Sequence, residues 1–338
     1  MIKKITYLLI AILLIAFAGY RYITNQVNEY VNQPLSMTQE RIFTLKTGTS
    51  FQRVLSDLTQ SDLIEPSDLT PLVRRFYPEL TQVKAGTYLL EPGLTLRQAL
   101  LLFKSGKEHQ FSITFVEGST FKEWRQALSQ APHLTHDTTE MTEAEIAQAL
   151  ELDVEKLEGM FLAETYHYTF GASELDILER ASRKLTQVLD YHWAERQRDL
   201  PLKSSYEALI LASIIEKETS VEEERERVAS VFVNRLNKGM RLQTDPTVIY
   251  GMGDSYDGNI RKKDLRTPTP YNTYVIFGLP PTPIAMPGEA SIAAATNPEN
   301  GDYYYFVASG TGGHVFSKTL AEHNRAVRAY LKQLRSKQ

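Results

Sequence analysis

Two glutamates, Glu216 and Glu218, stand directly behind a run of bulky aliphatic residues in the stretch LASIIEKETS, residues 211–220. Removing a carboxylate from water without giving it a partner is costly, so burial raises the pKa of such a group. A carboxyl that stays protonated near neutral pH can donate its proton to a leaving group, as a general acid must. The alternative is that the EKE run is a solvated helix end, as most charge runs are.

Helical spacing separates the two glutamates. Glu216 lies over Ser213 and Ala212, three and four positions earlier. Three bulky aliphatic residues lie three, four and seven positions before Glu218: Ile215, Ile214 and Leu211. The bulkier apolar stripe therefore leads to Glu218, and we expect desolvation to raise the pKa of that residue.

The residues after Glu218 predict a corner between two helices. The sequence SVEE, starting at Ser220, matches the Ser-x-x-Glu capping box, so a second helix is expected from Ser220 to Gly239. Glu218 would then lie where two helices meet, and its side chain could reach a cleft.

Two later segments are rich in Tyr, Pro, Gly and isolated amides: GMRLQTDPTVIYGMG (239–253) and TPYNTYVIFGLPPTPIAMPG (269–288). A sugar cleft uses amides to bond hydroxyl and acetamido groups, and aromatic rings to cover sugar C–H faces. We therefore select Gln243, Tyr250 and Asn272 as candidates for positioning a sugar.

The same residue types occur in ordinary turns, so Gln243, Tyr271 and Asn272 could equally be turn residues. Asp245 is a candidate for stabilising positive charge in a transition state. Because Asp245 precedes Pro246, it also matches a helix N-cap with proline at the first helical position.

The composition narrows the classes of protein that need to be considered. A chain of 338 residues suits two or three domains, and its net charge of −4 gives no reason to expect a nucleic-acid partner. Cysteine is absent, and the seven histidines are scattered without metal-ligand spacing. We therefore expect no metal, no cofactor and no disulfide framework.

The N-terminus departs from this average composition. Lys3 and Lys4 precede an uncharged, mostly apolar run from Ile5 to Tyr20, which ends before Arg21. The run is slightly shorter than the roughly 20 residues of a typical span, but Arg21 can snorkel to the interface. We expect a single-pass inner-membrane anchor with a cytoplasmic N-terminus, which places the rest of the chain in the periplasm of a bacterial cell.

A cleaved signal peptide is the alternative for this segment, because Ala16-Phe17-Ala18 has the small-x-small form of a cleavage site. The length of the apolar run favours the uncleaved anchor. In both cases the bulk of the chain is exported, and an exported chain without cysteine suits a bacterial envelope.

A strand, a turn and a helix recur three times after the anchor. Ser50, Thr95 and Thr120 follow short apolar strands and can each cap a helix. From residue 41 to about 105 the pattern resembles the LysM modules, which bind N-acetylated sugar chains such as peptidoglycan. A plain α+β fold with capped helices would give the same pattern.

The second half predicts helices separated by Pro/Gly-rich segments. A helix is expected from Ser173 to about Ala194, and a final amphipathic helix from about Thr319 to Leu334. Strands are expected at Tyr274 to Phe277 and at Tyr303 to Ala308, the latter within a hairpin. Helices and strands without a βαβ rhythm indicate an α+β fold.

Seven segments carry the most distinctive residues of the chain: LASIIEKET, VASVFVNRL, GMRLQTDPTVIYGMG, PYNTY, GLPPTPIAMPG, YYYFVASGTGGHVFS and AEHN. Together they resemble the MltG/YceG-like family, the membrane-anchored endolytic murein transglycosylases. The match covers nearly the whole chain and is most specific from about residue 205 to 324. In that family the second glutamate of the EKE stretch is the catalytic acid, which here is Glu218. One departure is Ala163-Glu164-Thr165, where the family has Pro-[Asp/Glu]-Thr, so a substrate role of Glu164 stays open.

The composition along the chain and the resemblance together predict five segments. They are a cytoplasmic tip and transmembrane anchor (1–23), a linker (24–40), a LysM-like domain (41–108), a connecting strand-helix subdomain (109–155) and a mixed α+β catalytic domain (156–338).

The resemblance also implies a lyase that cuts the MurNAc-β-1,4-GlcNAc bond within nascent glycan strands and leaves 1,6-anhydroMurNAc ends. Such an enzyme would end strand elongation beside the penicillin-binding peptidoglycan synthases. It needs one carboxylate, because the attacking hydroxyl belongs to the substrate. A second essential carboxylate at Asp245 or Glu224 would favour a lysozyme-like hydrolase instead.

Two other classes of protein share some of these sequence features. A non-catalytic, membrane-anchored scaffold that binds peptidoglycan would need the residues before about 110 and not Glu218. The segments STFK (119–122) and KTG (46–48) match signatures of acyl-serine enzymes. Their order is inverted and the Ser-x-Asn element is missing, so that class is not favoured.

Overall fold

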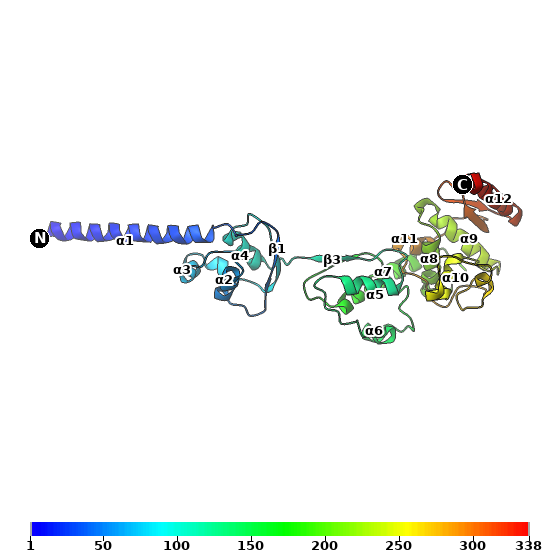
Figure 1. Cartoon of the computed structure of the whole chain (residues 1–338), viewed down its shortest axis with the longest axis horizontal. Coiled ribbons are helices and arrows are strands. Elements are labelled where there is room, and N and C mark those ends of the chain that lie inside the picture. Colours follow the sequence, from blue (N-terminus) through cyan, green and yellow to red (C-terminus); the bar gives the residue numbers. More distant parts are fainter. Residues whose placement is uncertain (1, 337–338) are drawn as a thin grey trace. The chain divides into compact units, whose positions relative to one another are not determined.

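The computed structural model describes residues 2–336 and is a mixture of helices and short strands (Figure 1). Its contacts divide the chain into two compact units, Met1–Phe111 and Ser112–Gln338, called unit 1 and unit 2 below. Over the described residues the strands form three two-stranded sheets. The α+β class expected from the sequence is the class observed.

Unit 1 begins with the long helix α1, Ile2–Val31 (Figure 1). An 18-residue window of this helix has a mean hydropathy of 2.0, and none of that window is buried, so α1 is long and apolar enough to cross a membrane. The helix continues into the segment expected to be a linker, residues 24–40. Val27 and Val31 of that segment are buried in the core of unit 1.

The rest of unit 1 contains the first two strand-turn-helix repeats. β1 (Arg41–Leu45) pairs antiparallel with β2 (Gly86–Leu90). Ser50 caps α2 (Phe51–Gln60), and Thr95 forms a capping box with Gln98 at the start of α4 (Leu96–Ser105). Between them lie α3 (Thr70–Phe76) and the 3₁₀ turn η1 (Pro78–Thr81). The repeats are observed, whereas their assignment to the LysM modules stays a prediction.

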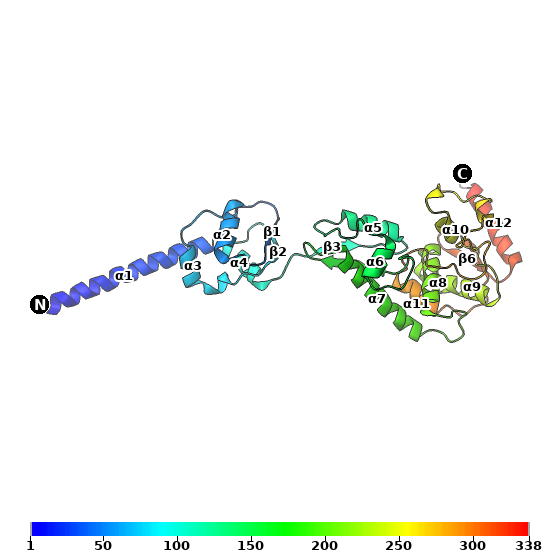
Figure 2. The same ribbon diagram turned by 90° about the horizontal axis from the view of Figure 1, so that it is seen from below.

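The third repeat opens unit 2. β3 (Phe111–Thr114) pairs with β4 (Thr165–Tyr168), and Thr120 forms the predicted cap of α5 (Phe121–Gln130). The helices α6 (Glu143–Ala149) and α7 (Glu174–Ala194) follow, and Figure 2 shows both grouped with α5. The helix expected from Ser173 to about Ala194 is α7, and Ser173 is its N-cap.

The core of unit 2 surrounds α8 (Ser205–Glu218), in which Ala208 to Ile215 are all buried. A helix that is apolar on every side must be covered on every side. It contacts α7, α9 (Arg225–Asn237), α10 (Asp245–Met252) and α11 (Glu289–Thr296). The Ala-rich α11 packs most extensively on α8, because small side chains permit a close approach.

The chain ends in a hairpin and a helix, as expected. β5 (Tyr305–Ala308) pairs antiparallel with β6 (His314–Ser317), and α12 (Leu320–Ser336) follows. The hairpin contacts α9 and α12 (Figure 1).

The expected strand Tyr274–Phe277 is wrong. The segment forms turns, because Asn272 accepts a hydrogen bond from the N–H of Tyr274 (2.9 Å) and donates to the Asp264 and Thr267 carbonyls. Two 3₁₀ turns precede it, η3 (Gly253–Ser255) and η4 (Asp264–Arg266).

The expected helix start at Ser220 is also wrong. Thr219 has an extended backbone, and its hydroxyl accepts the N–H of Val221 (3.0 Å), which leaves Ser220 exposed. A 3₁₀ turn, η2 (Glu222–Glu224), then leads into α9. Glu218 nevertheless lies at the corner between α8 and α9.

Candidate active site

Glu216 has a structural role at the α8–α11 contact. Its Oε2 accepts hydrogen bonds from the N–H of Gly288 (3.0 Å) and the hydroxyl of Ser291 (2.7 Å). Gly288 is the N-cap of α11, and a carboxylate is favourable where a helix leaves N–H groups unpaired. Glu216 therefore joins α8 to the start of α11.

Glu218 has different surroundings. It is the last residue of α8, its side chain is half-buried, and the Thr244 hydroxyl donates a hydrogen bond to Oε1. Burial raises the pKa of Glu218, and the charge of Asp245 raises it further, whereas the Thr244 hydrogen bond and the electrostatic influence of His314 and Arg235 lower it. The net direction is upward, which is the direction required for a general acid.

A cavity of about 340 Å³, the Glu218 cavity, lies against this carboxyl. Its lining comes from segments far apart in the chain, including Arg235 of α9, Gln243 of the loop before α10, and Tyr305 of β5. Further polar lining is contributed by Asp245, Tyr274 and His323. A concave site with a few convergent polar groups and one carboxyl of raised pKa is typical of an active site.

Two of the four candidate substrate-binding residues, Gln243 and Asp245, line the Glu218 cavity. Gln243 has a φ of 50°, a left-handed conformation that is costly for a residue with a side chain and is often found at functional sites. Asp245 is not the N-cap of α10, a position that Thr244 occupies, but the first residue of that helix. It accepts a hydrogen bond from the Tyr274 hydroxyl (2.7 Å).

The other two candidates lie elsewhere in unit 2. Asn272 is 1% exposed and all its side-chain hydrogen bonds hold the turn before Tyr274. Tyr250 packs edge-on against Tyr271, with ring centroids 4.8 Å apart, and its hydroxyl hydrogen-bonds Glu158. Neither lines the Glu218 cavity.

Several lining residues were not selected from the sequence. Arg235 donates to the carbonyls of Tyr304 and Leu242 (both 2.7 Å), and its guanidinium lies 5.2 Å from the Tyr305 ring centroid. Arg235 therefore connects α9, the Gln243 loop and the hairpin. It lies within the segment VASVFVNRL, but nothing in that segment indicates partners 69 residues away.

His323 of α12 also closes the cavity. Its ring stacks on Tyr305 at 5.2 Å, and burial together with the charge of Arg235 lowers the pKa of His323. A neutral imidazole at neutral pH offers both a donor and an acceptor to a ligand.

Glu224, the other candidate for a second carboxylate, binds the β5–β6 hairpin and does not line the Glu218 cavity. It accepts hydrogen bonds from the backbone N–H (2.9 Å) and Nδ1 (2.7 Å) of His314. The second carboxyl group that lines the Glu218 cavity is therefore Asp245.

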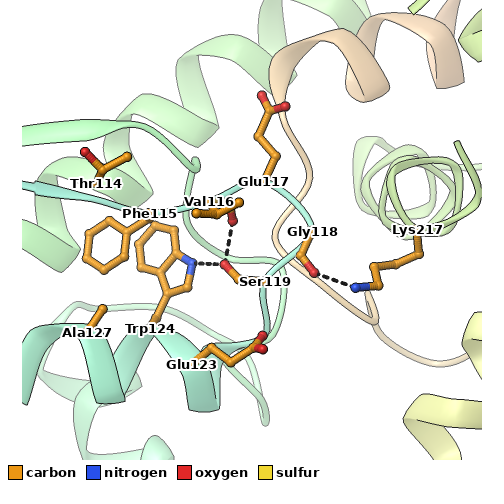
Figure 3. Close-up of a pocket in the computed structure, with 10 residues that line it drawn as sticks. All are labelled: Thr114, Phe115, Val116, Glu117, Gly118, Ser119, Glu123, Trp124, Ala127 and Lys217. Carbon is orange, nitrogen blue, oxygen red and sulfur yellow. Dashed lines mark hydrogen bonds between the residues drawn. The ribbon is translucent and has the colours of Figure 1, made fainter. Parts of the chain in front are cut away.

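Ser119 of the Ser-x-x-Lys match lines a different cavity, of about 370 Å³, shown in Figure 3. The Ser119 hydroxyl donates to the Val116 carbonyl (2.5 Å) and accepts from the Trp124 indole N–H (2.9 Å). The Lys122 ammonium pairs with Asp254 at 2.6 Å. Because Ser119 and Lys122 bind other partners, the pair lacks the serine–lysine contact of an acyl-serine enzyme.

The comparisons with known proteins extend over both units. A sequence model of the YceG-like family matches residues 43–329. The chain belongs to the YceG-like family. The matched range, residues 43–329, includes every residue that lines the Glu218 cavity.

Relatives in this family carry a functional name. An endolytic murein transglycosylase of Bacillus subtilis (strain 168) is 32% identical over 305 residues, which are 85% of this chain and 84% of that protein. An endolytic murein transglycosylase of Streptococcus pneumoniae (strain D39) is 25% identical over 92% of this chain. That match spans 61% of the pneumococcal protein, which is therefore considerably longer.

A solved structure shares the fold of the family. The crystal structure of a yceG-like protein from Listeria monocytogenes aligns with a TM-score of 0.55 and 30% identity. The alignment covers 85% of this chain and 98% of the Listeria chain.

Proposed function

We propose that this protein is an endolytic murein transglycosylase with Glu218 as its general acid. The observation that carries the proposal is the Glu218 carboxyl at the end of a buried helix, with a raised pKa and facing a polar cavity. Membership of a family whose curated relatives are named endolytic murein transglycosylases supports the choice of substrate.

The first step is proton donation. Protonated Glu218 gives its proton to the oxygen of the MurNAc-β-1,4-GlcNAc bond, and that bond breaks with its electron pair on the departing GlcNAc oxygen. Positive charge then develops at the anomeric carbon of MurNAc. Asp245 lines the same cavity and can stabilise this charge, and the Tyr274 hydroxyl fixes its orientation.

The second step returns the proton. The Glu218 carboxylate takes the proton from the C6 hydroxyl of the same MurNAc as the C6 oxygen bonds to the anomeric carbon. The product is a 1,6-anhydro sugar, Glu218 is protonated again, and no water is consumed. The Thr244 hydroxyl bonds Oε1 and can stabilise the carboxylate that exists between the two steps.

A lysozyme-like hydrolase is the second candidate, because Asp245 lines the cavity together with Glu218. In that mechanism the second carboxyl would attack the sugar or activate water. Asp245 already accepts the Tyr274 hydroxyl, and its charge raises the pKa of Glu218, which favours an electrostatic role. The two mechanisms differ in product, since a hydrolase leaves a reducing-end MurNAc.

The cellular setting is part of the proposal. The unburied apolar window of α1 suits a single-pass anchor, and Lys3 and Lys4 before it favour a cytoplasmic N-terminus. The remainder of the chain would then face nascent peptidoglycan in the periplasm, beside the penicillin-binding synthases. Cleavage there would end strand elongation.

The test is mass spectrometry of the products from purified glycan strands treated with the detergent-solubilised full chain. We expect 1,6-anhydroMurNAc ends with the natural protein and none with Glu218→Gln. Reducing-end MurNAc would identify a hydrolase. Intact strands that nevertheless bind the protein would support the scaffold and overturn the proposal.

A further inference from the structure

Unit 2 contains a larger cavity, of about 760 Å³, whose role the acid chemistry does not explain. Glu158 lies in its lining, and the cavity is called the Glu158 cavity below. Two of its other lining residues, Lys217 and Pro246, are the chain neighbours of Glu218 and Asp245. The two cavities therefore share the end of α8 and the start of α10.

The helix α10 separates the two cavities. Its first residue, Asp245, lines the Glu218 cavity. Pro246, Ile249 and Tyr250 line the Glu158 cavity and follow the three- and four-residue spacing of a single helix face. A polymer that crosses the end of α8 at Glu218 can therefore reach both cavities.

The polar group of the Glu158 cavity is held in place. Glu158 is 6% exposed, its Oε1 accepts the N–H of Phe121 (3.0 Å), and its carboxyl hydrogen-bonds the Tyr250 hydroxyl. Burial raises the pKa of Glu158 to about 7. A buried carboxyl that carries a proton for part of the time at neutral pH can donate as well as accept a hydrogen bond.

Aromatic rings supply the other half of the lining. Tyr250 and Tyr271 pack edge to face, and the Tyr271 hydroxyl is anchored by Thr282 (2.9 Å). The ammonium of Lys156 lies 5.5 Å from the Tyr271 ring centroid. Half-buried tyrosine rings with polar groups at their edges are suited to the mixed apolar and hydroxyl faces of a sugar.

The charges of the cavity favour a neutral ligand. Two lysines of the lining already have partners. The Lys122 ammonium forms an ion pair with Asp254 at 2.6 Å, and the Lys217 ammonium donates to the Gly118 carbonyl (2.9 Å). The remaining charged lining residues are Glu123, Glu143, Lys156 and Glu158. Because acidic groups are at least as numerous as basic ones, the carboxylates of a peptide stem would not be attracted here.

We propose that the Glu158 cavity is a remote sugar subsite, which binds an N-acetylated sugar of the same glycan strand to one side of the bond that Glu218 cuts. This inference rests on the proposed function. Binding at a distance from the reacting bond supplies energy for orienting that bond. The subsite would make cleavage depend on the strand continuing past the active site, which is what internal cutting requires.

The test compares long uncrosslinked glycan strands with the shortest strand that the full chain cuts, whose few sugars extend least toward the Glu158 cavity. For Tyr271→Ala and Lys156→Ala we expect kcat/KM to fall more on the long strand than on the short one, by at least about fivefold in the ratio. Lys156 is exposed, so its removal places little demand on folding. Tyr191→Ala, at an exposed ring on α7, is the matched control and should leave the ratio unchanged.

Three outcomes are distinguishable. A lowered ratio supports the subsite. Equal losses on both strands, or no losses, with normal 1,6-anhydro products overturn the subsite and leave the proposed function standing. Failure of the natural protein to cut either strand overturns the proposed function, and this inference with it.

Discussion

Glu218 and Glu158 are two carboxyls of unit 2 whose pKa values are both raised, in each case chiefly by burial. Their surroundings differ. Glu158 is 6% exposed in the lining of the Glu158 cavity and is bonded to a backbone N–H and a tyrosine, whereas Glu218 is half-buried, ends a helix and lies beside a second carboxyl, Asp245. The difference shows that a raised pKa only keeps a carboxyl protonated at higher pH. Whether that proton can reach a substrate depends on where the carboxyl lies and what it is bonded to.

The largest expected effect separates the two carboxyls by rate. Glu218→Gln removes the proton that must reach the glycosidic oxygen, so we expect kcat/KM to fall about a thousandfold or more. Glu158→Gln keeps a neutral hydrogen-bonding side chain, and its loss on the short strand should be at least about a hundredfold smaller. Initial rates of 1,6-anhydroMurNAc formation measure both. Comparable losses of kcat/KM in the two variants would mean that Glu158 also takes part in the chemical step, which would contradict the account.

The second effect concerns stability and belongs to Glu158. Its pKa is about 7 in the folded protein and about 4.5 when unfolded, so the folded state holds its proton more tightly. The free energy of unfolding should therefore fall between about pH 4.5 and 7, by about 3 kcal/mol, and this decline should be missing in Glu158→Gln.

Tryptophan fluorescence during urea unfolding can measure this decline. The chain has two tryptophans, Trp124 and Trp193, and both belong to unit 2, so the signal reports on that unit. Identical pH dependence in the natural and Glu158→Gln proteins would contradict the burial argument.

The smallest expected effect is a loss of stability at Glu216, two positions before Glu218. Glu216→Ala loses the hydrogen bonds to Gly288 and Ser291 at the start of α11, so we expect unit 2 to lose about 1–2 kcal/mol of stability. The exposed Glu223→Ala is the matched control and should change stability by less than about 0.5 kcal/mol. The same fluorescence assay measures both variants. If Glu216→Ala were as stable as the control, the proposed role of Glu216 in joining α8 to α11 would be wrong.

Local chemistry allowed part of this fold to be predicted from the sequence. Ser50, Thr95 and Thr120 cap the helices that they were expected to cap, because a cap depends on residues within one turn. The same type of argument failed at Ser220. There the preceding Thr219 hydroxyl takes the nearby N–H of Val221, a competing local bond that the capping pattern does not include.

The residues of the candidate site also fall into those that the sequence predicts and those that it does not. Glu218 was selected from its aliphatic neighbours, although α8 proves to be buried on every side and the faces are distinguished by what covers them. Thr244 and Arg235 could not be selected, because their contacts join segments that meet only in the folded chain. The sequence predicts a strand through Tyr274, but the side chain of Asn272 holds a turn there, and the Tyr274 hydroxyl donates to Asp245.

The most direct test of the central claim is the pH dependence of kcat/KM on the short strand for the natural protein and Asp245→Asn. A general acid must be protonated, so the rate should fall as pH rises through the pKa of Glu218. Because the charge of Asp245 raises that pKa, the fall should move to lower pH in Asp245→Asn and stay in place in Glu158→Gln. A midpoint that does not move in Asp245→Asn, or a rate that rises with pH over this range, would contradict Glu218 as the acid.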